Sequence, residues 1–255
     1  MTKLPKAHKF FDVSDYGRPA ARFIANSLQK SNFTPIHLTL IFSIVGFFAV
    51  ACIFLEYFWA ALFLLILKSV LDAADGELAR VKKTPSYTGR YLDSVADILL
   101  NLIIIMAIGI ITDEHIGLVM LGFLCIQLQG TLYNYYYVIL RNKMGGDKTS
   151  RIFEESKQVA MAGEKQKNVA ILFRMYRILY GKFDEFIFML DPKASKTNSF
   201  PNWFMTAVST FGLGFQLLII SLMLVLGWKE FIIPFFIFYS LFIFVFIGIR
   251  KIWLS

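Results

Sequence analysis

Long apolar runs recur along this chain of 255 residues, and they restrict its fold more than any other feature. A run of about 20 apolar residues is long enough to cross a hydrocarbon layer of about 30 Å as an α-helix. The composition agrees, because 57% of the residues are hydrophobic and the mean hydropathy is +0.60. We therefore predict an all-α, polytopic membrane protein that forms a single membrane domain over residues 1–255. Six transmembrane helices are expected, at approximately 35–56, 58–79, 90–112, 115–140, 203–227 and 230–250.

The lysine and arginine residues predict the orientation of these spans, because basic loops stay on the cytoplasmic side. The intervening turns carry a single lysine between them, so both termini are expected in the cytoplasm. The net charge of +8 is then explained by topology and by anionic lipid head groups, and no nucleic-acid partner is predicted. The basic clusters are Lys3, Lys6, Lys9, Arg18, Arg22 and Lys30; Arg80, Lys82, Lys83 and Arg90; Arg141, Lys143, Lys148 and Arg151; and Arg250 with Lys251.

Two segments are too polar to be spans. Residues 14–30 place apolar side chains on one side of a helix and arginines on the other, which is typical of an amphipathic helix lying in the membrane interface. Residues 142–200 form a long cytoplasmic insertion whose second part predicts another amphipathic helix at the interface. No cleavable signal peptide is expected, because no apolar region directly follows the N-terminal charges.

Four aspartates interrupt the apolar pattern around the second loop. Asp72 and Asp75 are spaced i,i+3 and Asp93 and Asp97 are spaced i,i+4, so each pair shares one helix face. At about 1.5 Å per residue the two pairs reach a similar depth on neighbouring helices. Four convergent carboxylates need cations, and ligands made only of oxygen favour Mg²⁺, Mn²⁺ or Ca²⁺. Two divalent ions would balance the four charges.

The residues beside the acids indicate phosphate chemistry. Gly76 leaves bare backbone where a ligand can approach, and Arg80 supplies a planar fork suited to a phosphate group. The alternative is an internal salt-bridge network in which Lys68, Arg80 or Arg90 pairs with the acids. That alternative explains neither the glycine nor the matched depth of the acids.

The pattern Asp72-x2-Asp75-Gly76-x2-Ala79-Arg80-x8-Gly89-x3-Asp93-x3-Asp97 resembles the motif of the CDP-alcohol phosphotransferase (CDP-alcohol phosphatidyltransferase) family at every fixed position. The resemblance implies the family's fold, in which six membrane helices follow an N-terminal interfacial amphipathic helix. It also implies a homodimer. The insertion at 142–200 is longer than compact members have.

The resemblance implies a role for each motif residue. Asp72, Asp75 and Asp93 would hold one Mg²⁺ or Mn²⁺ ion, and Asp72, Asp93 and Asp97 would hold a second. Asp97 would also be the general base for the acceptor hydroxyl. The CDP-linked donor would contact Thr39, Gly76, Arg80 and Ser86. Members carry a donor-binding Asn-x-x-Thr after a proline at the first span, and here Ile36 replaces the asparagine while Pro35 and Thr39 match.

Other polar residues in the spans allow two interpretations each. Asn101, one turn beyond Asp97, could line the same cavity or form a hydrogen bond between helices. Tyrosines and glutamines near the cytoplasmic end of the fourth span, within residues 127–137, could form an interfacial belt or an acceptor site. Lys68 is expected to pair with Asp72 in preference to binding a substrate.

The implied function is metal-dependent transfer of a phosphatidyl group from CDP-diacylglycerol to a polar alcohol, with release of CMP, in phospholipid biosynthesis. The alternative is transfer of a small phospho-head group from a CDP-alcohol to a lipid alcohol, which uses the same motif. A divalent-cation transporter is a more remote alternative. Its ligands would lie near the middle of the bilayer with access from both sides, whereas the four acids here are expected in the cytoplasmic half. Resemblance to short bacterial members implies the inner membrane, with membrane lipids as neighbours and the active site facing the cytoplasm.

The topology can be tested by cysteine labelling. A membrane-impermeant reagent added outside the cell should modify a cysteine placed at Asp113, in an outer turn, and miss one placed at Lys83, in a basic cytoplasmic loop. The reverse labelling pattern would exclude this orientation.

Overall fold

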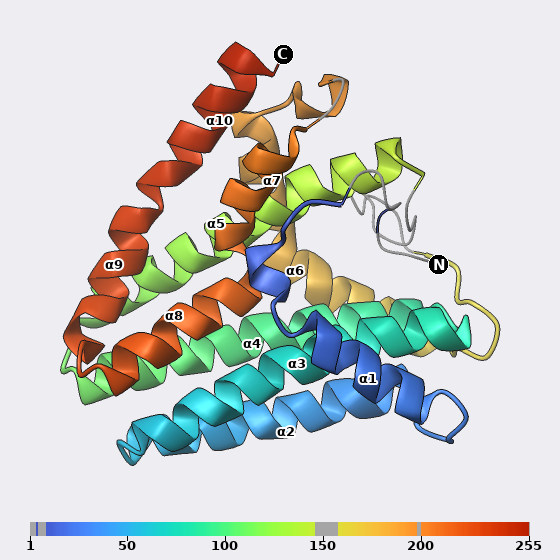
Figure 1. Ribbon diagram of the computed structural model, residues 1–255, viewed down its shortest axis with the longest axis horizontal. Helices are drawn as coiled ribbons and strands as arrows, with labels where there is room; N and C mark the ends of the chain where they lie inside the picture. Colours follow the sequence, from blue (N-terminus) through green and yellow to red (C-terminus); the bar gives the residue numbers. More distant parts are fainter. Residues whose placement is uncertain (1–3, 5–8, 146–157, 198–199, 255) are drawn as a thin grey trace.

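The computed structural model describes Leu4 and residues 9–145, 158–197 and 200–254. Within these ranges all regular elements are helices, which confirms the predicted all-α class (Figure 1). The α-helices are α1 (Arg18–Leu28), α2 (Pro35–Phe54), α3 (Phe58–Lys82), α4 (Tyr87–Ile111), α5 (Ile116–Lys143), α6 (Gln166–Leu190), α7 (Asn202–Val208), α8 (Leu213–Val225), α9 (Ile232–Tyr239) and α10 (Leu241–Trp253). The short 3-10 turns are η2 (Val13–Asp15), η3 (Ala194–Lys196), η4 (Ser209–Phe211) and η5 (Lys229–Phe231).

Four helical segments of the described chain are long and apolar enough to cross a membrane: α2, α4, α5 and the segment Lys229–Trp253. A bent pair, Asn202–Phe211 with Leu213–Val225, makes a fifth if it is one span. The protein is therefore a helical membrane protein with four to five such segments. The predicted sixth is α3, which is 25 residues long but carries Lys68 and two of the acids, so the count of six stays a prediction.

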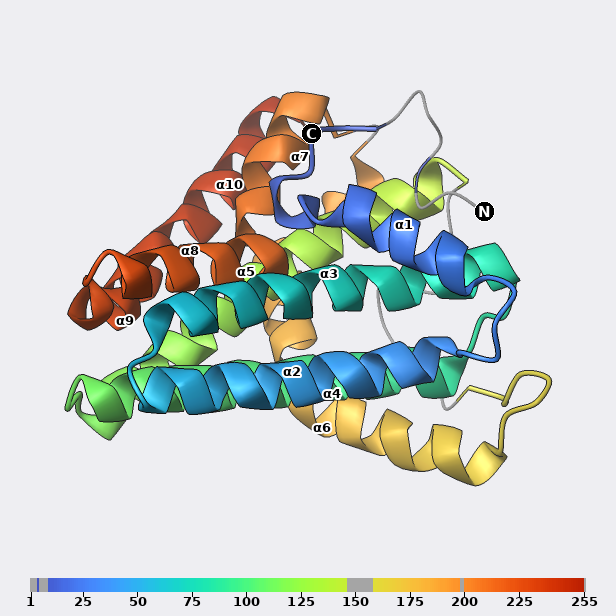
Figure 2. The ribbon, with the colours of Figure 1, turned by 60° about the horizontal axis from the view of Figure 1, so that its bottom comes forward.

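Helices α3 and α4 carry the acids, and α2 packs against both of them, with α1 and α8 packed on α3 and α6 packed on α4 (Figure 2). An apolar core fills the space between α2, α3, α4, α5, α8 and α9, on the part of α3 that precedes Lys68. It includes Ala61, Leu65, Ile105, Ile108, Ile220 and Phe236, all buried. Helix α2 packs against both α3 and α4, so this core sets the separation of the two helices that carry the acids.

A helix is present in the predicted N-terminal segment 14–30. Pro19 occupies its first turn, where the missing N–H has no partner to lose. Ala21 and Ala25 are buried against the α3 side, whereas Phe23 is largely exposed. The small alanines let α1 approach α3 closely. Its position in the membrane interface stays a prediction.

The predicted span 203–227 is divided in the structure into α7 and α8, which meet at a bend of 53°. The bend lies at Gly212, where the N-terminal segment crosses: a Cβ at Gly212 or Gly214 would overlap Ser14. The amide of Val13 also donates a hydrogen bond to Ser209 Oγ at 2.9 Å. Because Gly212 and Gly214 lack a side chain, the N-terminal segment can pack directly against the start of α8.

The insertion at 142–200 contributes α6, a helix of 25 residues that covers the predicted amphipathic segment. Tyr91 of α4 is fully buried and contacts Phe173 and Tyr176 of α6. The hydroxyl of Tyr180 donates a hydrogen bond to the Ser94 carbonyl at 3.0 Å. Helix α6 is thus part of the fold beside the acids, and its position at the interface stays a prediction. Four of the predicted topology charges lie outside the described residues: Lys3, Lys6, Lys148 and Arg151.

The contact at Gly214 generates a stability prediction. Replacing Gly214 with alanine would force the new methyl group into the Ser14 backbone, and overpacking of this kind costs about 1–3 kcal/mol. We expect a lower midpoint of thermal unfolding in detergent. The matched control is Gly248→Ala on α10, where nothing lies within 4 Å, and which should be neutral or slightly stabilising. Equal midpoints for the two variants would contradict the assigned packing.

Candidate active site

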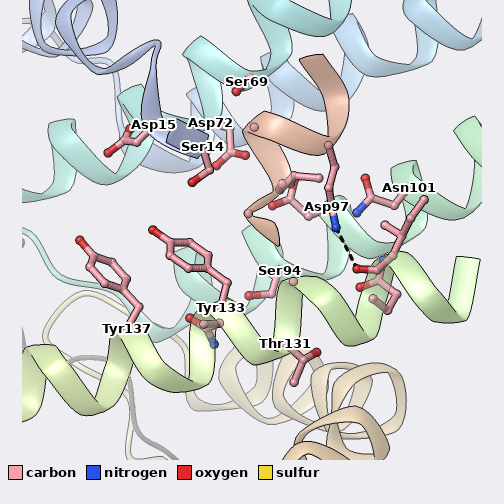
Figure 3. Close-up of a pocket in the computed structure, with 18 of the residues that line it drawn as sticks. Ser14, Asp15, Ser69, Asp72, Ser94, Asp97, Asn101, Thr131, Tyr133 and Tyr137 are labelled. Atoms are coloured by element: carbon pink, nitrogen blue, oxygen red, sulfur yellow. Dashed lines mark hydrogen bonds between the residues drawn. The ribbon is translucent and has the colours of Figure 1, made fainter. Parts of the chain in front are cut away.

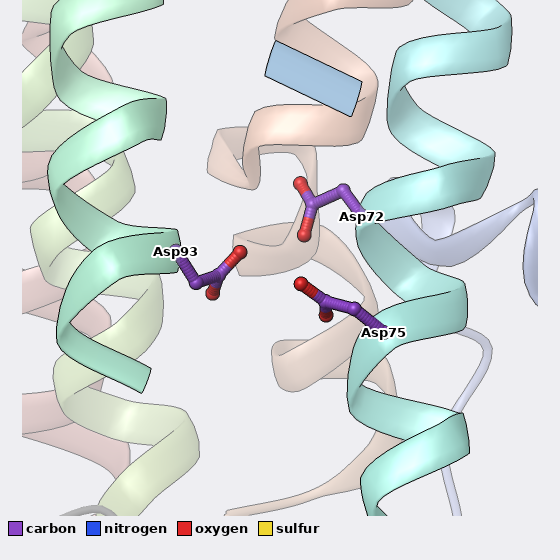
Figure 4. A group of neighbouring side chains, drawn as sticks. All are labelled: Asp72, Asp75 and Asp93. Carbon is purple, nitrogen blue, oxygen red and sulfur yellow. The ribbon is translucent and has the colours of Figure 1, made fainter. Parts of the chain in front are cut away.

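Three of the four predicted acids converge in the structure. Asp72 and Asp75 project from α3 and Asp93 projects from α4 toward them (Figure 4). One carboxylate oxygen of each lies within 4.8 Å of the others. The i,i+3 spacing on α3 and the antiparallel course of α4 produce this arrangement, as the sequence predicted for these three residues.

Asp97 lies one turn further along α4 and is held by Lys68. The Lys68 Nζ donates to Asp97 Oδ1 and also to Asp72 Oδ2, the latter at 3.2 Å. Lys68 is fully buried, with its ammonium 4.7 Å from the centre of the Phe42 ring. The predicted pair with Asp72 is confirmed, whereas the contact with Asp97 was not predicted. The role of Asp97 as a ligand of a second metal ion stays a prediction.

The remaining two acids have no such counter-ion among the described residues. Asp75 accepts a hydrogen bond from Thr39 Oγ1 at 2.7 Å, while Asp93 Oδ1 is buried without a hydrogen-bond partner in the described part of the chain. An uncompensated buried carboxylate is costly, so internal salt bridging accounts for Asp72 and Asp97 only. Three converging carboxylates with an unpartnered oxygen fit a hard divalent cation, which Asp72, Asp75 and Asp93 would hold.

The four predicted donor contacts line one cavity of about 700 Å³, here called the first cavity. It lies between the start of α2, the end of α3 and the start of α4. Asp75 and Asp93 line it, and Lys83 and Arg90 add positive charge. The predicted residues in its lining are Thr39, Gly76, Arg80 and Ser86. The sequence pattern therefore identified residues that the fold brings to one place.

Arg80 is oriented by a residue that the sequence analysis did not identify. Glu77 Oε1 lies 3.2 Å from Arg80 Nη2 and accepts a hydrogen bond from Arg18 Nη1 at 2.6 Å. Gly76 lies beneath the Arg80 guanidinium, because a Cβ there would sit 3.5 Å from its Nη1. Glu77 thus ties α1 to α3 and holds the Arg80 fork over the bare backbone. In the sequence, Glu77 directly follows Gly76 of the motif, and this position was the signal that could have identified it.

Ser86 begins α4, and its hydroxyl is bound to a residue of the insertion. Ser86 Oγ caps the helix by accepting from the Gly89 amide at 2.9 Å and donates to Glu164 Oε1 at 2.7 Å. The Glu164 carboxylate also accepts from the amides of Thr88 at 2.6 Å and Met161 at 2.9 Å. A negative charge at a helix N-terminus is stabilising. The insertion therefore fixes the edge of the first cavity, which Met161 also lines.

A second cavity, of about 330 Å³, lies on the other side of the acids between α3, α4, α5, α6 and α8 (Figure 3). Its walls are mostly polar, and both the N-terminal segment and α6 contribute to them. The residues labelled in the figure are Ser14, Asp15, Ser69, Asp72, Ser94, Asp97, Asn101, Thr131, Tyr133 and Tyr137. Asn101 therefore lines the cavity, which was one of the two interpretations that the sequence allowed. Tyr133 and Tyr137 line it as well.

The acids separate the two cavities. Asp75 and Asp93 line the first cavity, whereas Asp72 and Asp97 line the second, and Arg141 reaches both. A group bound in one cavity would meet a group bound in the other at the carboxylates. This arrangement suits a transfer reaction between two substrates that enter from different sides.

A membrane-embedded transferase acting on a phosphate-containing substrate is the class that this fold and site define. The family model of the CDP-alcohol phosphatidyltransferases matches residues 32–228, which include every motif residue. The chain belongs to this family, whose members are transferases of substituted phosphate groups and use a CDP-linked alcohol. The transporter alternative is not supported. No individual curated protein matches the chain at a significant level.

Glu164 generates a prediction about pH. Burial alone would raise the pKa of Glu164, but the hydrogen bonds from Thr88, Met161 and Ser86 outweigh burial and lower the pKa of this carboxyl. A carboxyl with a lowered folded pKa stabilises the fold above its unfolded value of about 4.3, and this contribution is lost as the pH falls through the folded pKa. Protection of the Thr88 amide from hydrogen exchange should therefore collapse only in strongly acidic solution.

The test compares Glu164→Gln with Glu185→Gln. The glutamine at 164 cannot carry the charge, so the Thr88 amide should exchange faster at neutral pH and show no acid transition after correction for intrinsic exchange. Glu185 lies on α6 and forms an exposed pair with Lys182, so its replacement should leave the Thr88 amide unchanged. An acid transition that persists in Glu164→Gln would assign it to another group.

Proposed function

We propose that this protein transfers a phosphatidyl group from CDP-diacylglycerol to the hydroxyl of a polar alcohol and releases CMP, in phospholipid biosynthesis. The observation that carries the proposal is the division of the four acids between two cavities. The polar walls of the second cavity support a polar acceptor. They give less support to the alternative, in which a lipid alcohol accepts a small head group.

The donor would bind in the first cavity. Arg80, held by Glu77, and Lys83 offer positive charge to its phosphates. Gly76 leaves its backbone open to the diphosphate. Thr39 and Ser86 would complete the pocket, with Thr39 also orienting Asp75. Ile36 stands where the family motif has asparagine, so the hydrogen bond of that asparagine has no counterpart at this position.

Asp72, Asp75 and Asp93 would hold one divalent cation, Mg²⁺ or Mn²⁺, and Asp72, Asp93 and Asp97 a second. Bound cations would offset the negative charge that builds on the phosphates as CMP leaves. The convergence of the first three acids and the unpartnered Asp93 oxygen support this set.

Asp97 would accept the proton of the acceptor hydroxyl. It faces the second cavity, and the Lys68 ammonium orients its carboxylate. The deprotonated hydroxyl oxygen of the acceptor attacks the phosphorus that carries the diacylglycerol. The bond from that phosphorus to the bridging oxygen breaks, and CMP leaves with the electron pair. The proton ends on Asp97 and passes to solvent or to CMP.

We further propose that the protein is a multi-pass protein of the bacterial inner membrane, with both termini and the active site in the cytoplasm. The one-sided distribution of lysine and arginine supports the orientation. A homodimer is proposed from the family resemblance alone.

The mechanism predicts that replacing Asp97 and replacing Asp75 impair different steps, turnover in the first case and binding of metal and CDP in the second. Asp97→Asn keeps the size of the side chain but cannot accept the proton, so turnover should fall by roughly 10²–10⁴-fold while a CDP analogue is still retained in the presence of metal. Asp75→Asn should weaken binding of both metal and CDP, with part of the activity recovered at high Mg²⁺. Wild-type protein stripped with EDTA provides the metal-free baseline and should be inactive.

Turnover and retention of the CDP analogue are measured separately for each variant over a range of Mg²⁺ concentrations. Rescue of Asp97→Asn, but not Asp75→Asn, by Mg²⁺ would show that the base is assigned to the wrong residue. Full turnover of the stripped wild type in excess EDTA would exclude metal dependence.

A further inference from the structure

Two buried polar groups in the second cavity have no partner in the described part of the chain. Gln127 and Thr131 lie one turn apart on α5 and are only 5% and 6% exposed. Neither the Gln127 Nε2 nor the Thr131 Oγ1 forms a hydrogen bond with a described residue. A buried polar group left without a partner costs about 1–3 kcal/mol. Both residues line the second cavity, so a ligand bound there can supply the missing partners.

The neighbouring side chains extend the same chemistry around the cavity. Asn101 and Ser94 of α4 and Asn134 of α5 line it together with Gln127 and Thr131. Hydroxyl and amide groups both donate and accept hydrogen bonds. A ligand with several hydroxyl groups can do the same at each position. The volume of about 330 Å³ falls at the small end of the range for small-molecule sites.

The charges around the cavity oppose a phosphorylated ligand. Lys68 and bound cations would offset Asp72 and Asp97, but three further carboxylates also line the cavity: Asp12, Asp15, which is paired with Arg18, and Asp184. Arg141 is the one cation among the described lining residues, and it is buried with its guanidinium 5.7 Å from the centre of the Tyr137 ring. A phosphate group would meet carboxylates here, and like charges brought together at an interface cost several kcal/mol.

We infer that the acceptor is an uncharged polyol, a small alcohol with several hydroxyl groups and no phosphate. The inference rests on the proposed function and adds the class of its acceptor. One hydroxyl would reach Asp97 and react, while the others bind the unpartnered groups of Gln127 and Thr131. These two residues would act as specificity residues on the acceptor side and would not contact the CDP moiety.

The experiment uses the purified full chain in detergent with CDP-diacylglycerol and Mg²⁺. Glycerol, ribitol and myo-inositol are compared with glycerol 3-phosphate, myo-inositol 1-phosphate and L-serine, measuring CMP release and lipid product. Binding of the tritiated polyols is measured in parallel, without donor. At least one polyol should bind, and its kcat/KM should exceed that of the phosphorylated probes by about a hundredfold or more.

The variants are Thr131→Val and Gln127→Met, which keep the volume and remove the polar group. Each should raise the KM for the preferred polyol by roughly five- to tenfold, with the KM for CDP-diacylglycerol unchanged. The control is Ser221→Ala on α8, whose buried hydroxyl bonds only to its own helix at Leu217 and Leu218 among the described residues. It should change neither KM.

Each other outcome overturns the inference. A phosphorylated probe or L-serine preferred with CDP-diacylglycerol would reject the polyol and leave the proposed function intact. Absence of binding and turnover for all three polyols would also reject it, as would variants that behave like Ser221→Ala. A separate arm offers CDP-ethanolamine with diacylglycerol, and CMP release in that arm alone would reject the proposed function together with the inference.

Discussion

The buried Lys68 ammonium joins the two helices on which the site depends. It lies between Asp72 of α3 and Asp97 of α4 and is fully buried, so its charge is tolerated only because both carboxylates face it. The carboxylates need the lysine for the same reason. This pairing fixes α3 against α4 and leaves Asp75 and Asp93 to face the first cavity without a counter-ion among the described residues. Lys68 thus pairs with two of the four acids, and one of these, Asp72, also converges with Asp75 and Asp93 in the group that could hold a cation.

The insertion completes the site from outside the family motif. Glu164 binds the N-terminus of α4 and the hydroxyl of Ser86, so it holds the turn that borders the first cavity. Tyr180 of α6 binds the carbonyl of Ser94 and lines the second cavity. The segment before α1 closes the same cavity through Ser14, which packs against Gly214. Elements that the sequence suggested as lipid contacts therefore also shape both cavities.

The sequence was sufficient to predict those features of the site that depend on a local pattern. Spacing along α3 and α4 predicted the convergence of Asp72, Asp75 and Asp93, because helical periodicity and an antiparallel turn set it. It could not predict that Lys68 reaches Asp97, since this depends on how α3 and α4 are placed relative to each other through α2. The contact of Glu164 with Ser86 joins residues 78 positions apart. The bend at Gly212 coincides with the approach of Ser14, and the contact between Val13 and Ser209 joins residues 196 positions apart, so it could not be predicted from residues 203–227 alone.

The two cavities explain why the motif alone leaves the acceptor open. Motif residues such as Gly76 and Arg80 line the first cavity, where the chemistry common to the family is needed. Apart from Asp72 and Asp97, the polar lining of the second cavity comes from outside the motif, including Gln127 and Thr131. Under the proposed function, substitutions at Gln127 and Thr131 would change the acceptor without altering the lining of the first cavity or the acids. Under that proposal, the acceptor is selected by side chains packed around α5, and their shared cavity forms only when the helices are placed together.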